Sequence, residues 1–398
     1  MGKMKKILMI CTKYPLDLNS TWLTRELAEE FNNRGYVIDV ICIDWGVLQK
    51  RKKISLNNIN IYNVPALGCK KTSFLNFFIK WGGSSLYAAL LNFRVFFKRH
   101  DLVISFSPCA SSWFAIILGI FFSKKSLLIY WDFFPIHQVQ IDLIKGRFKP
   151  KILKCFEKAL VKMFDYIGCM SKGNCEFFVE YFKTRREKVF ELPIWSEGLR
   201  TNGLIKSKSV SFIDSNSIYF VFGGQIDYGR GIECILSAAK IAHKKNNKIK
   251  TIIIGRGRLV DQVIKDAESI ENGIIYSDFI PRNDYLTLVS VCRAGLIATV
   301  PNVSVPTYPS KCLDYMKLSI PIIASIEDTT DFGEIIINAG AGLCCNAGDS
   351  NALAAAMLSL AEDELLASQM GEKANLFFKN RHEVKTVVNN LLEHIKED

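Results

Sequence analysis

The chain has 398 residues, of which 49% are hydrophobic and 23% charged, and its formal net charge at pH 7 is +12. This length exceeds what one hydrophobic core usually supports, so two domains are expected, and the apolar content excludes a mainly disordered chain. The 12 cysteines are scattered, with no CxxC pair and no Cys/His cluster at metal-ligand spacing. This pattern indicates reduced core cysteines of a cytosolic protein and predicts no metal site.

Strand and helix patterns alternate along the first half of the chain. KKILMIC (5–11) has only five apolar residues after its lysines, far fewer than a signal peptide needs, so we interpret it as the first β-strand. Further strands are predicted near 37–43, 102–106, 126–131, 166–169 and 188–191. Helices are predicted near 20–34, 74–99, 111–122, 151–164 and 173–182. Such alternation favours a parallel sheet with helices on both faces.

Positive charge is concentrated in this first half. Residues 1–200 contain 31 Lys and Arg against 16 Asp and Glu, whereas residues 201–398 contain 20 against 23. The first half therefore faces an anionic partner, and without a nucleic-acid-binding motif an anionic membrane surface is favoured over nucleic acid. The apolar run 113–122 is shorter than the about 20 residues of a spanning helix. Its bulky neighbours fit either an interfacial surface or buried helices with snorkelling lysines.

The polar stretch 197–217 predicts a linker. It separates an N-terminal, acceptor-binding domain (1–196) from a C-terminal domain (218–398), whose last helix is a candidate to pack back on the first domain. Strands in the second half are predicted near 217–222, 250–254, 273–276, 294–298, 321–324 and 342–344. We therefore expect two doubly wound, Rossmann-like α/β domains with a ligand cleft between them.

A glycine-rich turn follows the first strand of the second half. In FGGQIDYGRGIECILSAAK (222–240), Arg230 stands between two glycines directly before a helical pattern. A turn without side chains lets backbone N–H groups approach a ligand, and the amino end of a helix favours anions. The turn is therefore a candidate phosphate site with Arg230 as a fixed charge. An ordinary strand-to-helix turn with a solvated arginine is the alternative.

Three later segments have compatible features. IIIGRG (252–257) is a buried strand entering another glycine turn, and a loop at 278–281 follows the next strand. In TYPSKCLDYMKLSIPIIAS (307–325), Ser310 is the expected cap of a helix over about 311–317, and Asp314 lies one turn into it. Such a helix start suits a diphosphate, and a carboxylate one turn further can accept both hydroxyls of a ribose.

Together these segments resemble the C-terminal half of glycosyltransferase family 4, which contains retaining enzymes of the GT-B fold. The resemblance is carried by the glycine turn, IIIGRG, FIPRNDYLTL (279–288) and PSKCLDYMKLSIPIIAS (309–325), and the Pro-Ser-Lys form is similar to the O-antigen and capsule branch. KKILMICTKYP (5–15) and LIYWDFFP (128–135) extend it more weakly into the first half.

The resemblance implies a set of site residues. The implied catalytic residues are Asp132, Arg230 and Lys311, and the implied donor-binding residues are Gly224, Gln225, Arg230, Gly255, Phe279, Ile280, Ser310, Lys311 and Asp314. The sequence also departs from the family pattern. Gln225 replaces the usual first cation, Arg230 replaces a lysine, and the first of two usual glutamates falls on Pro306 while Asp314 holds the place of the second.

The implied reaction is glycosyl transfer from a nucleotide sugar to a lipid-linked saccharide with retention at the anomeric carbon. The cations and backbone amides would stabilise the departing diphosphate without a metal or other cofactor. Asp132 would orient the acceptor hydroxyl or steady charge on the sugar ring, although a structural aspartate after a strand is an equal alternative. His137, five positions further on, is interpreted as structural. The expected location is cytoplasmic, at the inner face of the plasma membrane.

Two other functional classes are compatible with this architecture. A nucleotide-sugar epimerase would need paired carboxylates at the sugar, and a phosphorylase would need a lysine-bound cofactor, and the sequence shows neither signal. A non-catalytic, membrane-associated scaffold is motivated by the missing glutamate and the missing first cation. Stabilisation by nucleoside diphosphates distinguishes a working donor site from such a scaffold.

Overall fold

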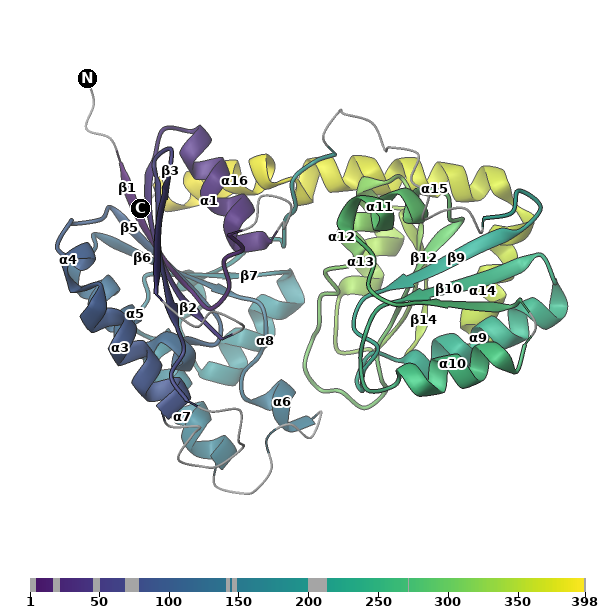
Figure 1. Cartoon of the computed structure of the whole chain (residues 1–398), viewed down its shortest axis with the longest axis horizontal. Coiled ribbons are helices and arrows are strands. Elements are labelled where there is room, and N and C mark those ends of the chain that lie inside the picture. The colour runs from purple at the N-terminus through teal and green to yellow at the C-terminus, as the bar shows by residue number, and fades with distance from the viewer. Residues whose placement is uncertain are drawn as a thin grey trace. The chain divides into compact units, whose positions relative to one another are not determined.

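The chain folds into two compact units. They comprise Met1–Ser196 with Val387–Asp398, and Glu197–Thr386. The computed structural model describes residues 5–16, 22–45, 51–68, 79–140, 144, 149–199, 213–270 and 272–396. The predicted linker 197–217 therefore lies mostly outside the described residues. Each unit has one β-sheet covered by helices on both faces, as predicted (Figure 1).

The first unit contains an eight-stranded sheet in the order β3-β4-β2-β1-β5-β6-β7-β8. Its strands are β1 (Lys6–Cys11), β2 (Val37–Asp44), β3 (Lys52–Leu56), β4 (Ile59–Pro65), β5 (Leu102–Phe106), β6 (Lys125–Tyr130), β7 (Tyr166–Cys169) and β8 (Val189–Glu191). All neighbouring strands are parallel except β3 and β4. Near-continuous apolar runs form the central strands because both faces of the sheet are covered.

Helices of the first unit pack on both faces of this sheet (Figure 1). They are α1 (Leu23–Asn33), α3 (Ser84–Leu91), α4 (Phe93–Phe96), α5 (Trp113–Phe122), α6 (Ile136–Gln140), α7 (Lys149–Val161) and α8 (Lys172–Phe182). Short turns η1 (Ile79–Gly83), η2 (Cys109–Ser112) and η3 (Arg186–Lys188) complete the unit. The end of α16 (Val384–Lys396) also belongs to it, where the Lys125 ammonium donates a 2.7 Å hydrogen bond to the Ile395 carbonyl.

Two elements of the first unit differ from the sequence-based prediction. The β3–β4 hairpin was not predicted because its polar, mostly exposed β3 lacks an apolar run, and its turn contains Asn57 with a φ of 51°. The single helix predicted over 74–99 is wrong within the described residues from 79 onward. There it divides at Asn92, whose side-chain amide donates to the Ala88 carbonyl at 2.9 Å and competes with helix continuation.

The second unit contains a six-stranded parallel sheet in the order β11-β10-β9-β12-β13-β14. Its strands are β9 (Ile218–Gly223), β10 (Ile249–Ile254), β11 (Ile274–Ser277), β12 (Ala294–Ala298), β13 (Ile322–Ile326) and β14 (Gly342–Asn346). Strand order reverses between β9 and β12. Ligands of open parallel sheets bind at the carboxyl ends of the strands beside such a reversal, so this edge is where a donor site is expected.

The helices of the second unit cover this sheet (Figure 1). They are α9 (Ile232–Lys245), α10 (Val260–Glu268), α11 (Arg282–Ser290), α12 (Cys312–Lys317), α13 (Phe332–Asn338), α14 (Ser350–Glu362) and α15 (Glu364–Phe377), followed by the turn η5 (Phe378–His382). Apolar side chains of α9 and α14 form one core with those of β9, β10 and β12. Across the described part of the chain, no helix is both long and apolar enough to cross a membrane.

A buried carboxyl group joins α7 to the carboxyl end of β5. Glu157 is fully buried and accepts hydrogen bonds from the backbone N–H groups of Cys109 at 2.7 Å and Ala110 at 2.8 Å. Burial raises the pKa of Glu157 to about 7, although these hydrogen bonds oppose the shift. The carboxyl group therefore binds a proton in the folded state at pH values where the unfolded chain releases it.

This proton predicts a pH-dependent stability of the first unit. Relative to Glu157→Gln, the wild-type free energy of unfolding should fall by about 1 to 3 kcal/mol as pH rises from 4.5 to about 7, and then level off. Below 4.5 the carboxyl group is protonated in both states, so its contribution is fully present there. Urea unfolding followed by tryptophan fluorescence measures it, because all 6 tryptophans lie in the first unit. A difference independent of pH would contradict the role of Glu157.

Candidate active site

The turn between β9 and α9 closes against the end of β12. Gly231 is the N-cap of α9 and has a φ of 57°, a left-handed conformation that favours glycine. A Cβ atom on Gly231 would lie 2.6 Å from the Ala298 Cβ and 2.7 Å from the Thr299 carbonyl oxygen. No side chain caps α9 at Gly231. The amino end of this helix therefore lies at the strand reversal with a positive partial charge suited to an anion.

The second glycine turn packs directly on the first. Gly255 has a φ of 147°, and a Cβ atom there would lie 1.8 Å from the Gly224 carbonyl oxygen. The Gly224 N–H donates to the Ile254 carbonyl at 2.9 Å, and the Ile226 N–H donates to the Arg256 carbonyl at 2.9 Å. Only glycine fits this backbone contact, which explains why both strands end in glycine turns. Gln225 is exposed within the first turn.

The Lys311 side chain extends over the Gly224 turn. A Cβ atom on Gly224 would lie 3.2 Å from the Lys311 Cε and 3.6 Å from its Nζ, which lies 3.8 Å from the centroid of the Phe222 ring. Burial, and then the nearby positive charge of Arg230, lower the pKa of Lys311 from 10.5 to about 7. The fold thus brings together Gly224, Lys311 and Arg230, three residues that the sequence predicted for one site.

The Asp227 carboxylate pairs with Arg258 at 2.7 Å and also interacts with the charge of Arg230, which helps to lower the pKa of Asp227. Neither the exposed Arg230 nor Lys311 forms an ion pair with a described carboxylate. The Arg230 backbone N–H donates to the Asp227 carbonyl at 3.2 Å. Lys311 and Arg230 repel each other beside the Gly224 turn, and this positive charge creates an electrostatic preference for an anionic ligand.

Asp314 is held by an arginine that the sequence analysis missed. The Arg282 guanidinium, at the start of α11, donates from Nη1 to Asp314 Oδ2 at 2.6 Å and from Nη2 to Asp314 Oδ1. This fork fixes the orientation of the half-buried carboxylate, whose remaining lone pairs can still accept hydrogen bonds. Arg282 directly follows the loop predicted to meet the base, but its pairing with a residue 32 positions away leaves no local signal in the sequence.

The loop after β11 presents an exposed aromatic ring. Phe279 is 66% exposed, and its N–H donates to Asp278 Oδ1 at 2.6 Å. Arg256 binds the Asp278 carboxylate through Nε at 2.6 Å and Nη2 at 3.2 Å, with its guanidinium 5.4 Å from the Phe279 ring centroid. Ile280 is half-buried beside Phe279. The Arg256–Asp278 pair therefore holds the loop that is predicted to bind the base. The sequence analysis did not identify this pair.

The start of α12 differs in detail from the prediction. Lys311, and not Ser310, is the N-cap of this helix, and no side chain caps it. Ser310 is exposed, and its carbonyl oxygen accepts a hydrogen bond from the Leu313 N–H at 3.2 Å. Pro309 and Ser310 form the turn that precedes the helix, so the Ser310 hydroxyl is not engaged as a cap.

Asp132 lies in the first unit, whereas the other predicted site residues lie in the second. It follows β6, and its N–H donates to the Ser107 hydroxyl oxygen at 3.2 Å, as the Trp131 N–H does at 2.9 Å. Ser107 thus orients the backbone at the carboxyl end of β6, and the Asp132 side chain is exposed. His137 is half-buried in α6, and its N–H donates to the Phe133 carbonyl at 2.9 Å.

Comparison with known proteins agrees with this geometry. Residues 205–377 match the family Glycosyl transferases group 1. Over 147 residues the chain is 31% identical to the probable glycosyltransferase WbjE of Pseudomonas aeruginosa, a match that covers 37% of this chain. It spans only about a third (36%) of the length of that relative.

Solved structures show the same fold over the whole chain. Sucrose-phosphate synthase from Thermosynechococcus elongatus has a TM-score of 0.75 at 13% identity, covering 99% of this chain and 98% of its own. Anabaena HepE, solved in complex with UDP and glucose, has a TM-score of 0.69 at 12% identity and full coverage of both chains. The expected fold of two doubly wound α/β domains, the GT-B fold, is confirmed.

The burial of Lys311 and its repulsion by Arg230 predict that the Lys311 charge lowers stability in the absence of ligand. Lys311→Met should raise the free energy of unfolding by about 1 to 3 kcal/mol at pH 6 to 7, because the variant no longer holds a desolvated charge beside Arg230. The folded-state pKa is lowered, so the wild type gains stability as pH rises from about 7 towards 10.5 and the difference should shrink. Urea unfolding followed by circular dichroism measures both effects. A less stable variant at pH 6 would contradict the account.

Proposed function

We propose that this chain transfers a sugar from a nucleoside diphosphate sugar to an acceptor hydroxyl. The observation that carries the proposal is the pair of Arg230 and Lys311 beside two interlocked glycine turns, where neither cation forms an ion pair with a described carboxylate. A diphosphate supplies the missing negative charge, and the amino end of α9 adds backbone donors. The presence of UDP in the structurally similar HepE supports a uridine nucleotide as the first ligand to test.

The chemistry follows from where charge develops. When the bond between the sugar and the diphosphate breaks, negative charge grows on the departing phosphate oxygens and positive charge grows on the ring. The Arg230 guanidinium and the protonated Lys311 ammonium stabilise the leaving group in the transition state. Asp314, oriented by Arg282, accepts the ribose hydroxyls, and the base lies against Phe279 and Ile280. The family resemblance further predicts that this reaction retains the anomeric configuration. It also predicts that the reaction needs no metal or other cofactor.

We further propose a lipid-linked saccharide as the acceptor, in the synthesis of a bacterial surface polysaccharide such as O-antigen or capsule. The support is the family resemblance and the excess of cations in residues 1–200, with 31 Lys and Arg against 16 Asp and Glu. The enzyme would then work in the cytoplasm at the inner face of the plasma membrane. Asp132, exposed at the carboxyl end of β6, is the proposed contact for the acceptor hydroxyl or the charged ring.

Release of nucleoside diphosphate tests the proposed reaction. The full chain is incubated with a panel of nucleotide sugars and lipid-linked acceptors, and free nucleoside diphosphate is measured with and without acceptor. The proposal predicts release from one or a few donors that depends on the acceptor. If no nucleoside diphosphate raises the melting temperature and no donor is consumed, the scaffold alternative is favoured and the transferase is rejected.

Substitution of Arg230 is the most direct mutational test of this mechanism. Arg230→Ala should lower turnover by about 10² to 10³-fold, because the departing diphosphate loses a preorganised charge in the transition state. Lys265→Ala is the matched control, since Lys265 is an exposed cation on α10 of the same unit. Turnover is measured under saturating donor. Equal turnover of Arg230→Ala and the control would remove Arg230 from the mechanism.

A further inference from the structure

Large apolar side chains are exposed together on one side of the first unit. They lie on α3, on α4 and the residue after it, and at the end of α5. They are Leu86, Tyr87, Leu90, Phe93, Phe97 and Phe121, with exposed fractions from 37% to 78%. We call this set the aromatic face. Single exposed apolar residues are common, but a contiguous group marks an interaction surface.

Ring contacts through Phe122 connect the three phenylalanines of the aromatic face. The Phe97 ring centroid lies 4.7 Å from that of Phe93 and 4.7 Å from that of Phe122. Phe122 in turn lies 5.0 Å from Phe121, which is 78% exposed. Helices α3 and α4 both pack against α5, which buries only Ala115, Ile116 and Gly119. The outer side of this apolar helix therefore remains part of the surface.

The surface extends along α5 to α7. Trp113, at the first position of α5, lies 6.1 Å from Phe156 on α7. Phe156 and Ile152 are one helical turn apart on α7 and are 38% and 66% exposed, and Met163, which is 41% exposed, follows the end of this helix. Together these residues place a second exposed apolar stripe beside the amino end of α5.

The charges on these segments are almost all positive. Residues 79–100 and 149–163 contain nine cations, namely Lys80, Arg94, Lys98, Arg99, Lys149, Lys151, Lys154, Lys158 and Lys162. The only carboxyl group in the same segments is Glu157, which is fully buried. These segments therefore combine apolar side chains with cations, and they expose no carboxylate. This composition fits the headgroup region of an anionic lipid bilayer, where apolar groups insert and cations meet phosphate.

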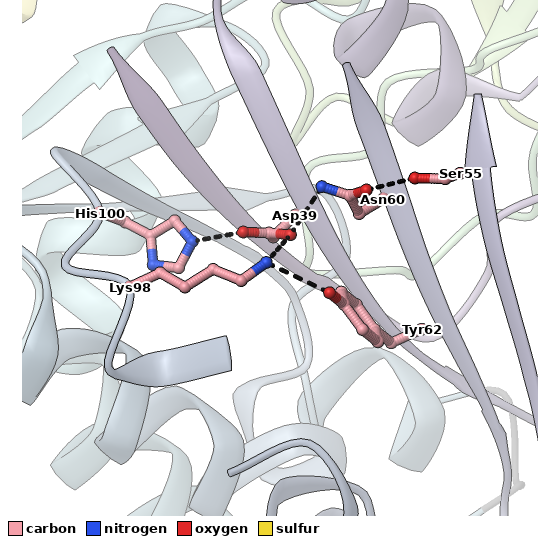
Figure 2. Close-up of polar contacts among 6 residues, drawn as sticks. All are labelled: Asp39, Ser55, Asn60, Tyr62, Lys98 and His100. Atoms are coloured by element: carbon pink, nitrogen blue, oxygen red, sulfur yellow. Dashed lines mark hydrogen bonds and ion pairs between the residues drawn. The ribbon is translucent and has the colours of Figure 1, made fainter. Parts of the chain in front are cut away.

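A polar network around the buried Asp39 joins Lys98 and His100 to the sheet (Figure 2). Directly after Phe97, the Lys98 ammonium donates to Asp39 Oδ1 at 2.7 Å, and His100 Nε2 lies 3.0 Å from Asp39 Oδ2. Asp39 is on β2, and Tyr62 on β4 accepts a 3.2 Å hydrogen bond from Lys98. Burial alone would raise the pKa of Asp39, but hydrogen bonds from His100 and Lys98 outweigh it and lower the pKa.

This network fixes the segment that carries Phe97 to the sheet. Asp39 and His100 are each only 1% exposed, and Asn60 on β4 also donates to Asp39 Oδ1 at 3.1 Å. Buried charges are retained only when they are paired and hydrogen-bonded, so the backbone from Lys98 to His100 has little freedom. Phe93 and Phe97 are therefore presented outward by a fixed support. Exposed rings held in this way are preorganised for contact with a second surface.

We infer that the aromatic face and the exposed stripe of α7 dock the first unit on an anionic lipid bilayer. The inference rests on the proposed lipid-linked acceptor, because docking would bring the acceptor-binding unit to the membrane where that acceptor resides. The absence of exposed carboxylates from the contributing segments favours a bilayer over a second copy of this basic chain, since two such faces repel each other.

Co-sedimentation with vesicles tests the inference on the full chain. Wild type should sediment with vesicles of phosphatidylglycerol and phosphatidylcholine, and less with phosphatidylcholine alone. Phe93→Ser/Phe97→Ser/Phe121→Ser should weaken this partitioning by at least about tenfold, because three exposed rings can no longer insert. The matched control is Ile337→Ser/Leu365→Ser/Leu376→Ser, which changes three residues of the second unit that are 54%, 69% and 59% exposed and should bind vesicles as wild type does.

The charge contribution is tested separately. Lys151→Gln/Lys162→Gln should reduce binding to the phosphatidylglycerol vesicles several-fold and leave binding to phosphatidylcholine alone unchanged. The inference is overturned if wild type does not sediment with anionic vesicles, if the aromatic-face variant sediments equally well, or if wild type forms a dimer that this variant abolishes. UDP binding, measured by calorimetry on the same samples, keeps the two proposals apart. UDP binding without vesicle binding rejects only the docking face, and vesicle binding without binding of any nucleoside diphosphate or consumption of any donor rejects only the transferase.

Discussion

The interaction between Lys311 and Arg230, two cations that form no ion pair with a described carboxylate, is the central feature of the second unit. Burial and the charge of Arg230 both disfavour protonation of Lys311, yet the fold places its Nζ over the Phe222 ring and beside the Gly224 turn. Such an arrangement is unfavourable in the empty protein and becomes favourable when an anion binds. The two cations lie beside the glycine turns. The amino end of α9 and the strand reversal between β9 and β12 are at the same site.

The same two cations can lower the stability of the ligand-free protein and favour binding of a diphosphate. A diphosphate between the guanidinium and the ammonium would relieve their repulsion and restore the protonated state of Lys311. The same charges would then stabilise the additional negative charge of the transition state with little reorganisation. Gly255 and Gly231 make the site possible because any larger residue would collide with the Gly224 carbonyl or with Ala298. In this account the two cations lower the stability of the ligand-free protein and raise its affinity for the diphosphate.

Much of the fold could be predicted from the sequence because buried parallel strands are long apolar runs. The strand expected near 102–106 is β5 at Leu102–Phe106, and the strand expected near 294–298 is β12 at Ala294–Ala298. The β3–β4 hairpin was missed because its edge strand is polar. Within the site, local motifs predicted Arg230 and Lys311, but not the pairing of Arg282 with Asp314. That pair depends on the packing of α11 against α12, which no local pattern encodes.

The pKa of Lys311 is the most direct test of the central claim. It can be measured by NMR of the labelled lysine side chain, with and without UDP, and Lys311→Met identifies the signal. The account predicts a value near 7 in the free protein, well below the ordinary 10.5, and a rise by at least about one unit when UDP binds. A free Lys311 that titrates near 10.5, or a value that UDP does not change, would contradict the proposed diphosphate site.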